Sequence, residues 1–154
     1  SNQIFFPGSI KSVSQILKSL EFLIINYKLN LKKFSIRNHP AVFNSKTHKT
    51  LEFRINKLKK KYKSNFKNNS FLNNYSIFIG ASGSIIEALE RNCKVIQITE
   101  VPILDFYSNY FWKSVKAKKI NDNIFTYSLS KKKNLIIFGK KPKNLNMFFN
   151  HSDI

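Results

Sequence analysis

Apolar and polar residues follow one another along this chain in blocks whose spacing changes from stretch to stretch. Residues 4–6 are an apolar run followed by Pro-Gly-Ser, which is typical of a strand that ends in a turn. Over residues 11–26 the apolar side chains recur every three or four positions, which predicts a helix with one buried face. Ser9 or Ser12 is the expected N-cap of that helix.

The next blocks repeat the order of strand and helix. Residues 34–37 predict a short strand, and Pro40 ends it because proline has no N–H to donate to a strand ladder. Residues 49–62 carry apolar side chains on one stripe and lysines elsewhere, so they predict a basic amphipathic helix. Residues 63–74 are polar and rich in asparagine, which indicates a loop.

The central part of the chain has a clear strand–helix–strand pattern. It predicts a buried strand at 76–79, a helix at 84–91 and a second buried strand at 95–98. Asn92 follows the helix at the position where a left-handed residue often ends one, and asparagine tolerates that conformation. The remaining predictions are an aromatic segment of undecided structure at 101–114, short strands at 124–128 and 135–138, and a disordered tail at 139–154.

Strands that alternate with helices predict a single α/β domain, Rossmann-like and three-layered, with a mostly parallel sheet. Ligands of such sheets bind at the carboxyl ends of the strands, near the point where the strand order reverses. Two motifs follow predicted strands: Arg-Asn-His-Pro at 37–40 and Gly-Ala-Ser-Gly-Ser at 80–84. If their strands lie close together in the sheet, both motifs face one crevice.

The motif at 80–84 has the composition of an anion site. Gly80 and Gly83 permit positive φ and a close approach of the backbone. Ser82 or Ser84 can cap a helix whose free N–H groups carry the positive end of its dipole. A tight strand-to-helix turn needs glycines and a serine cap even without a ligand, and a Walker A lysine is absent. Phosphate binding and plain turn geometry therefore both remain open.

Three other side chains are candidates for binding or catalysis. Arg37 can hold a phosphate through two hydrogen bonds, and His39 can donate to a phosphate or act as a general acid or base. Glu87 can accept hydrogen bonds from the two vicinal hydroxyls of a ribose. The structural alternatives are a solvated arginine, a histidine that fills a turn, and a glutamate that complements the helix dipole.

Composition adds anionic partners to the candidates and argues against a disulfide or a metal site. The net charge is +19, from 27 Lys+Arg against 8 Asp+Glu, and such a field attracts nucleic acid, anionic lipid or a phosphorylated substrate. The excess is mostly lysine, beside abundant asparagine, isoleucine and phenylalanine, so a compositional bias explains it without a partner. The single cysteine, Cys93, excludes an internal disulfide and is expected to be buried. Three histidines match no common zinc spacing, so neither a metal nor a bound cofactor is expected.

The stretches IRNHP and YSIFIGASGSIIEALERNCKVIQI together resemble the C-terminal half of GT-B glycosyltransferases. The resemblance is to bacterial surface-carbohydrate and capsule enzymes, including polymerases related to teichoic acid glycerophosphotransferases. In those families an Arg-x-His-Pro motif follows a strand, and a later strand leads through a turn of small residues to a helix bearing Glu-Ala. The resemblance covers residues 34–98.

The resemblance implies a role for each motif residue. Arg37 and His39 would approach the phosphates of a nucleotide-activated donor, with His39 as the catalytic candidate, and Glu87 would bind the ribose. Ile79 stands where many retaining enzymes carry a second glutamate, so this chain fits a retaining enzyme of that group poorly. The turn that would present backbone and hydroxyl donors to the diphosphate consists of Ser82, Gly83 and Ser84.

We therefore expect the donor-binding domain of a glycosyltransferase for bacterial surface polysaccharide, a fragment that would act as an enzyme when joined to an acceptor-binding half. The expected partners are a nucleotide-activated sugar and, through basic patches, an anionic membrane surface. The expected location is the cytoplasm, at the inner membrane. Two alternatives remain: a UDP-sugar 2-epimerase-like domain, and a basic nucleic-acid-binding module, although no recognised nucleic-acid signature is present.

Overall fold

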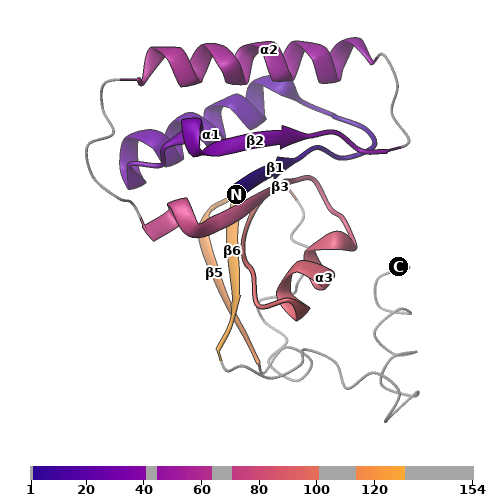
Figure 1. Ribbon diagram of the computed structural model, residues 1–154, viewed down its shortest axis with the longest axis vertical. Helices are drawn as coiled ribbons and strands as arrows, with labels where there is room; N and C mark the ends of the chain where they lie inside the picture. The colour runs from indigo at the N-terminus through magenta and orange to yellow at the C-terminus, as the bar shows by residue number, and fades with distance from the viewer. Residues whose placement is uncertain (1, 41–44, 64–70, 101–113, 131–154) are drawn as a thin grey trace.

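The structure is a computed structural model that describes residues 2–40, 45–63, 71–100 and 114–130 (Figure 1). In this part the chain forms six strands and three α-helices, with two short 3₁₀ turns. The elements are β1 (Asn2–Phe5), α1 (Val13–Tyr27), η1 (Leu31–Lys33), β2 (Phe34–Arg37), α2 (Lys46–Lys61), η2 (Phe71–Asn74), β3 (Tyr75–Ile79), α3 (Ser84–Glu90), β4 (Lys94–Ile98), β5 (Val115–Asn121) and β6 (Ile124–Leu129).

The strands form one mixed sheet in the order β2-β1-β3-β4-β6-β5. The first four strands are parallel, and β6 pairs antiparallel with both β4 and β5. The predicted α/β fold is confirmed, but the sheet is partly antiparallel because β5 and β6 form a hairpin at its edge. Strand β5 was not predicted, since all three of its exposed residues are lysines, a residue type that is common on edge strands.

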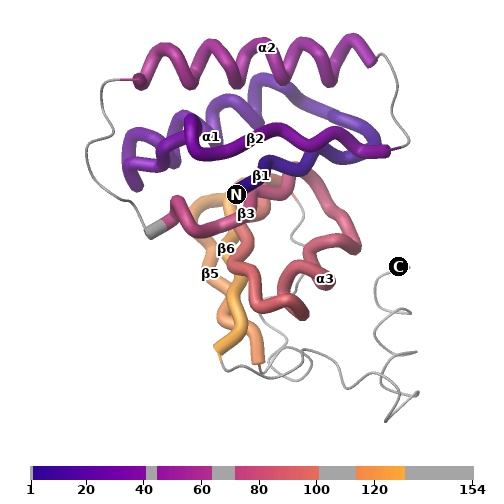
Figure 2. The backbone as a smooth tube through the Cα atoms, viewed as in Figure 1, coloured from indigo at the N-terminus to yellow at the C-terminus, as the bar shows by residue number. Residues whose placement is uncertain are grey.

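Two cores lie on opposite faces of the sheet because alternate residues of each strand point to opposite sides. Ile77 and Ile79 of β3 join the core under α1 and α2, whereas Phe78 joins a smaller core under α3. Figure 2 shows α1 and α2 side by side, with α3 apart from them. Helices therefore cover both faces of the sheet.

The helix ends follow local chemistry. Ser12 caps α1, as one of the two predicted serines, and its hydroxyl accepts a hydrogen bond from the Gln15 N–H. Helix α2 begins three residues earlier than predicted because Ser45 provides its cap. Asn92 has the predicted left-handed conformation, with φ of 63°. Each of these ends uses a residue that can satisfy the free backbone groups there or tolerate positive φ.

The prediction that Cys93 is buried is wrong, because the thiol is exposed. Cys93 lies in the tight connection from α3 to β4, where its N–H donates to the Ala88 carbonyl at 2.9 Å. The apolar run that enters the core begins only at Val95. An apolar-looking residue beside a helix end thus remains at the surface.

Several predictions fall outside the described residues: nearly all of the aromatic segment, residues 101–113, as well as the strand at 135–138 and the tail at 139–154. Among the helices described, none has the length and apolar character needed to cross a membrane.

Candidate functional site

The parallel strands place their carboxyl ends along one edge of the sheet. The chain leaves β1 for β2 on one side, and later proceeds from β3 to β4 on the other side. The strand order therefore reverses between β1 and β3. In open α/β sheets this reversal point is where ligands bind, because the loops separate there and leave a crevice.

A cavity of about 520 Å³ lies at this reversal point. Its walls come from the loop after β1, the first turn of α1, Gly80 and Ala81 after β3, and Thr99 and Glu100 after β4. Asn123, from the turn between β5 and β6, also lines it. The volume falls in the range of small-molecule sites, and an apolar floor with a few polar groups at the rim is typical of them.

The turn after β3 needs glycine at its first position. Gly80 has φ of 80°, a backbone conformation that residues with a side chain rarely adopt. A Cβ atom placed on Gly80 would lie 3.3 Å from the Cβ atom of Pro7, so the loops after β1 and β3 touch at this point. The Gly80 N–H donates to the Ile98 carbonyl at 2.8 Å, which ties the turn to β4.

A buried amide fixes the same turn from the other face of the sheet. Gln97 is fully buried, and its side-chain Nε2 donates to the Gly80 carbonyl at 3.1 Å. The Tyr127 hydroxyl donates to Gln97 Oε1 at 3.0 Å. A buried amide is costly unless it is hydrogen-bonded, so both hydrogen bonds of Gln97 favour this one arrangement. They therefore hold the turn at Gly80, and with it the cavity wall, in place.

The loop after β1 is held by a buried histidine of α2. His48 Nε2 lies 2.7 Å from the Pro7 carbonyl oxygen, and Nδ1 lies 2.8 Å from Ser45 Oγ. A carbonyl only accepts hydrogen bonds, so Nε2 carries a proton and donates. His48 thereby connects the start of α2 to the rim of the cavity.

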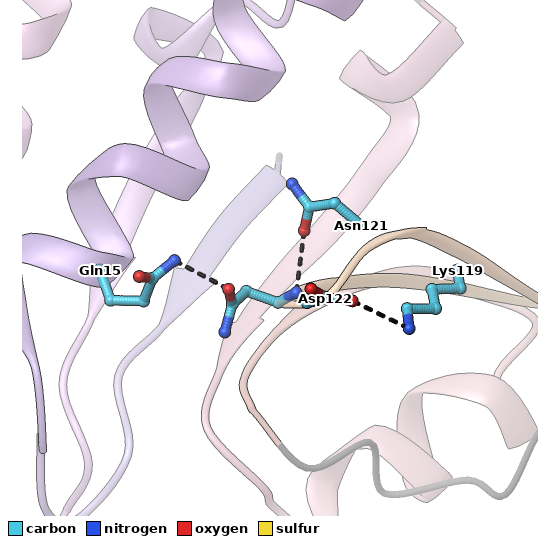
Figure 3. Close-up of polar contacts among 5 residues, drawn as sticks. Gln15, Lys119, Asn121 and Asp122 are labelled. Carbon is cyan, nitrogen blue, oxygen red and sulfur yellow. Dashed lines mark hydrogen bonds and ion pairs between the residues drawn. The ribbon is translucent and has the colours of Figure 1, made fainter.

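The opposite wall is closed by contacts between α1 and the β5–β6 turn (Figure 3). Gln15 Nε2 donates to Asn123 Oδ1 at 2.9 Å, and the Asn123 N–H donates to Asn121 Oδ1 at 2.9 Å. The Thr99 N–H donates to the Asn123 carbonyl at 2.8 Å. The antiparallel hairpin therefore contributes to the site, although the sequence analysis gave it no role.

The charge at the start of α1 suits an anion. The first turn of α1 contains no acidic residue, and Lys11 stands beside its Ser12 cap on the cavity wall. The N-terminal N–H groups of a helix carry a partial positive charge, which adds to that of the lysine. Among the described residues that line the cavity, Glu100 is the single acidic one.

Arg37 is the last residue of β2, the strand next to β1, and His39 follows it, but neither residue lines the cavity. The Arg37 guanidinium carbon lies 5.8 Å from the centre of the Phe5 ring, on the face of the sheet that α3 covers. His39 is exposed, and its Nδ1 would lie 4.0 Å from a Cβ atom placed on Gly8. Only His39 therefore reaches the loop that forms the rim.

The residues predicted after β3 lie beyond Ala81, outside the cavity. Ser82 Oγ accepts a hydrogen bond from the Ser84 N–H at 3.2 Å, so the serine satisfies one of the donors that a phosphate would use. Gly83 is the N-cap of α3, and Glu87 is exposed in its first turn. The turn geometry alone accounts for these features.

The structure brings the two motifs to one edge of the sheet but not into one cavity. Strand β1 lies between their strands, β2 and β3, so these two strands are about 10 Å apart at the usual strand spacing. The Pro-Gly-Ser turn after β1 forms a wall of the site that was not predicted from the sequence. The signal was present, since this turn follows the first strand and precedes a capped helix, which is the usual phosphate position in Rossmann-like folds.

Comparisons with protein-family models, curated proteins and solved structures find no match to this chain. Within the described ranges, no three His, Cys, Asp or Glu side chains are grouped so that they could hold a metal ion.

Proposed function

We propose that this chain is the donor-binding domain of a glycosyltransferase that acts in bacterial surface polysaccharide biosynthesis. The observation that carries the proposal is the cavity at the reversal point between β1 and β3. Its position agrees with the general binding place of nucleotides in α/β sheets. The sequence resemblance over residues 34–98 names the class of ligand.

In this proposal the cavity takes part of a nucleotide-activated sugar, and its phosphates lie near the start of α1. Lys11 and the free N–H groups of the first turn of α1 supply positive charge there. Gly80 carries no side chain, so the loop after β1 packs directly against the turn after β3 and the two loops together form one wall of the cavity. Catalysis would then consist of positioning and of stabilising the charge on the leaving phosphate.

The rim residues take the roles that the resemblance implies. His39 stands against the Gly8 loop, so it is the predicted side chain best placed to meet a phosphate at the mouth of the cavity. Arg37 and Glu87 lie on the α3 side of the sheet. A ligand would have to cross the ends of the strands to reach both these side chains and the cavity.

A panel of nucleotides tests the proposal. We would measure the thermal shift with CMP, CDP, UDP, GDP and ADP at about 0.15 M salt, where non-specific attraction to a basic protein is screened. We expect one base to stabilise the protein more than the others. Lys11→Ala should reduce the shift, whereas the control Lys18→Ala, which changes an exposed lysine of α1 that does not line the cavity, should not.

Two further variants test whether the side chains of His39 and Glu87 bind the nucleotide. His39→Ala and Glu87→Ala should each weaken the stabilisation by the preferred nucleotide without lowering the melting temperature of the free protein, because both side chains are exposed. Equal stabilisation by all nucleotides, or an effect that disappears at moderate salt, would contradict a donor site. If only Lys11→Ala has an effect, the nucleotide occupies the cavity and the roles carried over from the resemblance are wrong.

A further inference from the structure

The outward face of α2 carries a row of cations that the fold does not use. His48, Leu51 and Ile55 point into the core, so the opposite face of this helix points to solvent. That face presents positions spaced three, four, four and three residues apart, which align along one side of a helix. They are Lys46, Lys49, Phe53, Lys57 and Lys60, which we call the basic stripe.

Phe53 lies at the centre of the basic stripe. Its side chain is 59% exposed, and among the described residues Ile25 is the only other large hydrophobic residue that is exposed. Lys57 Nζ lies 4.7 Å from the centre of the Phe53 ring. The basic stripe thus combines one exposed apolar ring with flanking positive charges, which suits a partner that is both apolar and anionic.

The charge of the basic stripe is uncompensated. The four lysines form no ion pair with any other described residue, and the nearby Lys61 is the one paired with Glu21. In Figure 1, α2 is the outermost described element, and α1 lies on its inner side. A helix of 16 residues is about 24 Å long, so this charge extends along a straight, convex ridge.

We propose that the basic stripe docks this protein on the surface of an anionic lipid bilayer. The lysines meet the lipid headgroups, and Phe53 inserts among them, where aromatic rings are well accommodated. This surface is separate from the cavity and does not depend on what the cavity binds. It would hold the domain beside any substrate that resides in the membrane.

A bilayer fits the basic stripe better than a nucleic acid does. Single-stranded nucleic acids bind in grooves with several aromatic rings on which successive bases stack, whereas this ridge has one ring. The Lys57 ammonium already lies over that ring, where a base would stack. The charges of the stripe are all lysines, which act as point charges without the bidentate geometry that reads base edges; the one arginine of α2, Arg54, is exposed beside the stripe.

Vesicle co-sedimentation of the full chain tests the proposal. The probes are phosphatidylcholine vesicles with and without about one-third phosphatidylglycerol, at about 0.15 M salt. We expect binding to the anionic vesicles only. The double variant Lys49→Glu/Lys57→Glu should weaken it at least about tenfold. The control Lys116→Glu/Lys118→Glu, on the exposed edge strand β5, makes the same charge change and should weaken it less than about threefold.

The aromatic residue has its own matched control. Phe53→Ala should weaken binding to anionic vesicles severalfold, whereas Ile25→Ala, which removes a side chain that is 60% exposed, should not. Equal losses in the two charge variants would show that net charge alone drives binding and would overturn the proposal. So would an absence of vesicle binding, or a tighter and Phe53-dependent association with a single-stranded oligonucleotide in the same buffer.

Discussion

At the scale of single residues, Gly80 shows how one position sets the shape of the candidate site. Its φ of 80° turns the chain out of β3, and the absence of a side chain lets Pro7 approach. Gly83, three residues later, has φ of −60°, and a Cβ atom placed on it would meet nothing within 4 Å. The two glycines of the same motif therefore differ: one is required by the backbone, and the other is not.

Gly80→Ala should lower the free energy of unfolding by about 1–3 kcal/mol, because alanine is strained at positive φ and its methyl group meets Pro7. Gly83→Ala should change it by less than about 1 kcal/mol, since alanine adopts the helical φ of Gly83 without strain and its methyl group would meet no neighbour. Urea unfolding of both variants checks this. Equal destabilisation by the two substitutions would mean that the turn is not held as described.

Sequence reasoning identified this motif as a turn but could not distinguish its two glycines. The conformation of Gly80 depends on the loop after β1, which is more than seventy residues away along the chain. Likewise, the support from Gln97 and Tyr127 depends on strand pairing that no local pattern specifies. Contacts between distant segments were thus the part of the site that could not be predicted.

At the scale of elements, the packing of α1 against α2 is reinforced by one ionic contact. Lys61 Nζ lies 3.2 Å from Glu21 Oε2. A hydrogen bond from Tyr62, and then that from Lys61, hold the pKa of Glu21 below its ordinary range. A carboxyl whose pKa is lower in the folded state than in the unfolded state stabilises the fold above the unfolded value, and the contribution is lost as pH falls through the folded value.

Glu21→Gln should therefore lower the melting temperature slightly at pH 7, because it removes the charge that Lys61 and Tyr62 meet. The difference from the wild type should shrink once the pH falls below about 4.3, the ordinary pKa of glutamate, as the wild-type carboxyl becomes protonated. Thermal unfolding of both proteins between pH 3 and pH 7 measures it. A difference in melting temperature between the two proteins that is the same at pH 3 as at pH 7 would contradict this account.

The elements themselves were largely predictable where one face is buried. Strands β1 to β4 and helices α1 to α3 follow from apolar spacing, because their inward side chains form the two cores. The edge strand β5 was not predictable, since an outer strand buries little and its lysines resemble a loop. The Asn123 wall of the cavity lies in the turn that joins β5 to β6, and the sheet is mixed because β6 pairs antiparallel with β4.

At the scale of the whole molecule, the protein has two surfaces that differ in chemical character. The carboxyl edge of the sheet carries a cavity with Lys11 at one side and Glu100 at the other. The outer face of α2 carries lysines around Phe53. The net charge of +19 does not distinguish them, so composition alone could not locate either surface. The positions of the charges relative to the core are what support our proposals of a small ligand for the first surface and a bilayer for the second.

The central claim is that nucleotides bind at the carboxyl edge of the sheet, and NMR titration of the ¹⁵N-labelled protein with UDP and with CDP tests it most directly. We predict saturable shifts of the amides of Gly8, Gly80 and Thr99 at about 0.15 M salt, with no change at Lys49, Phe53 or Lys57 of α2. Shifts confined to α2, or spread evenly over the lysine-rich surface, would contradict the claim.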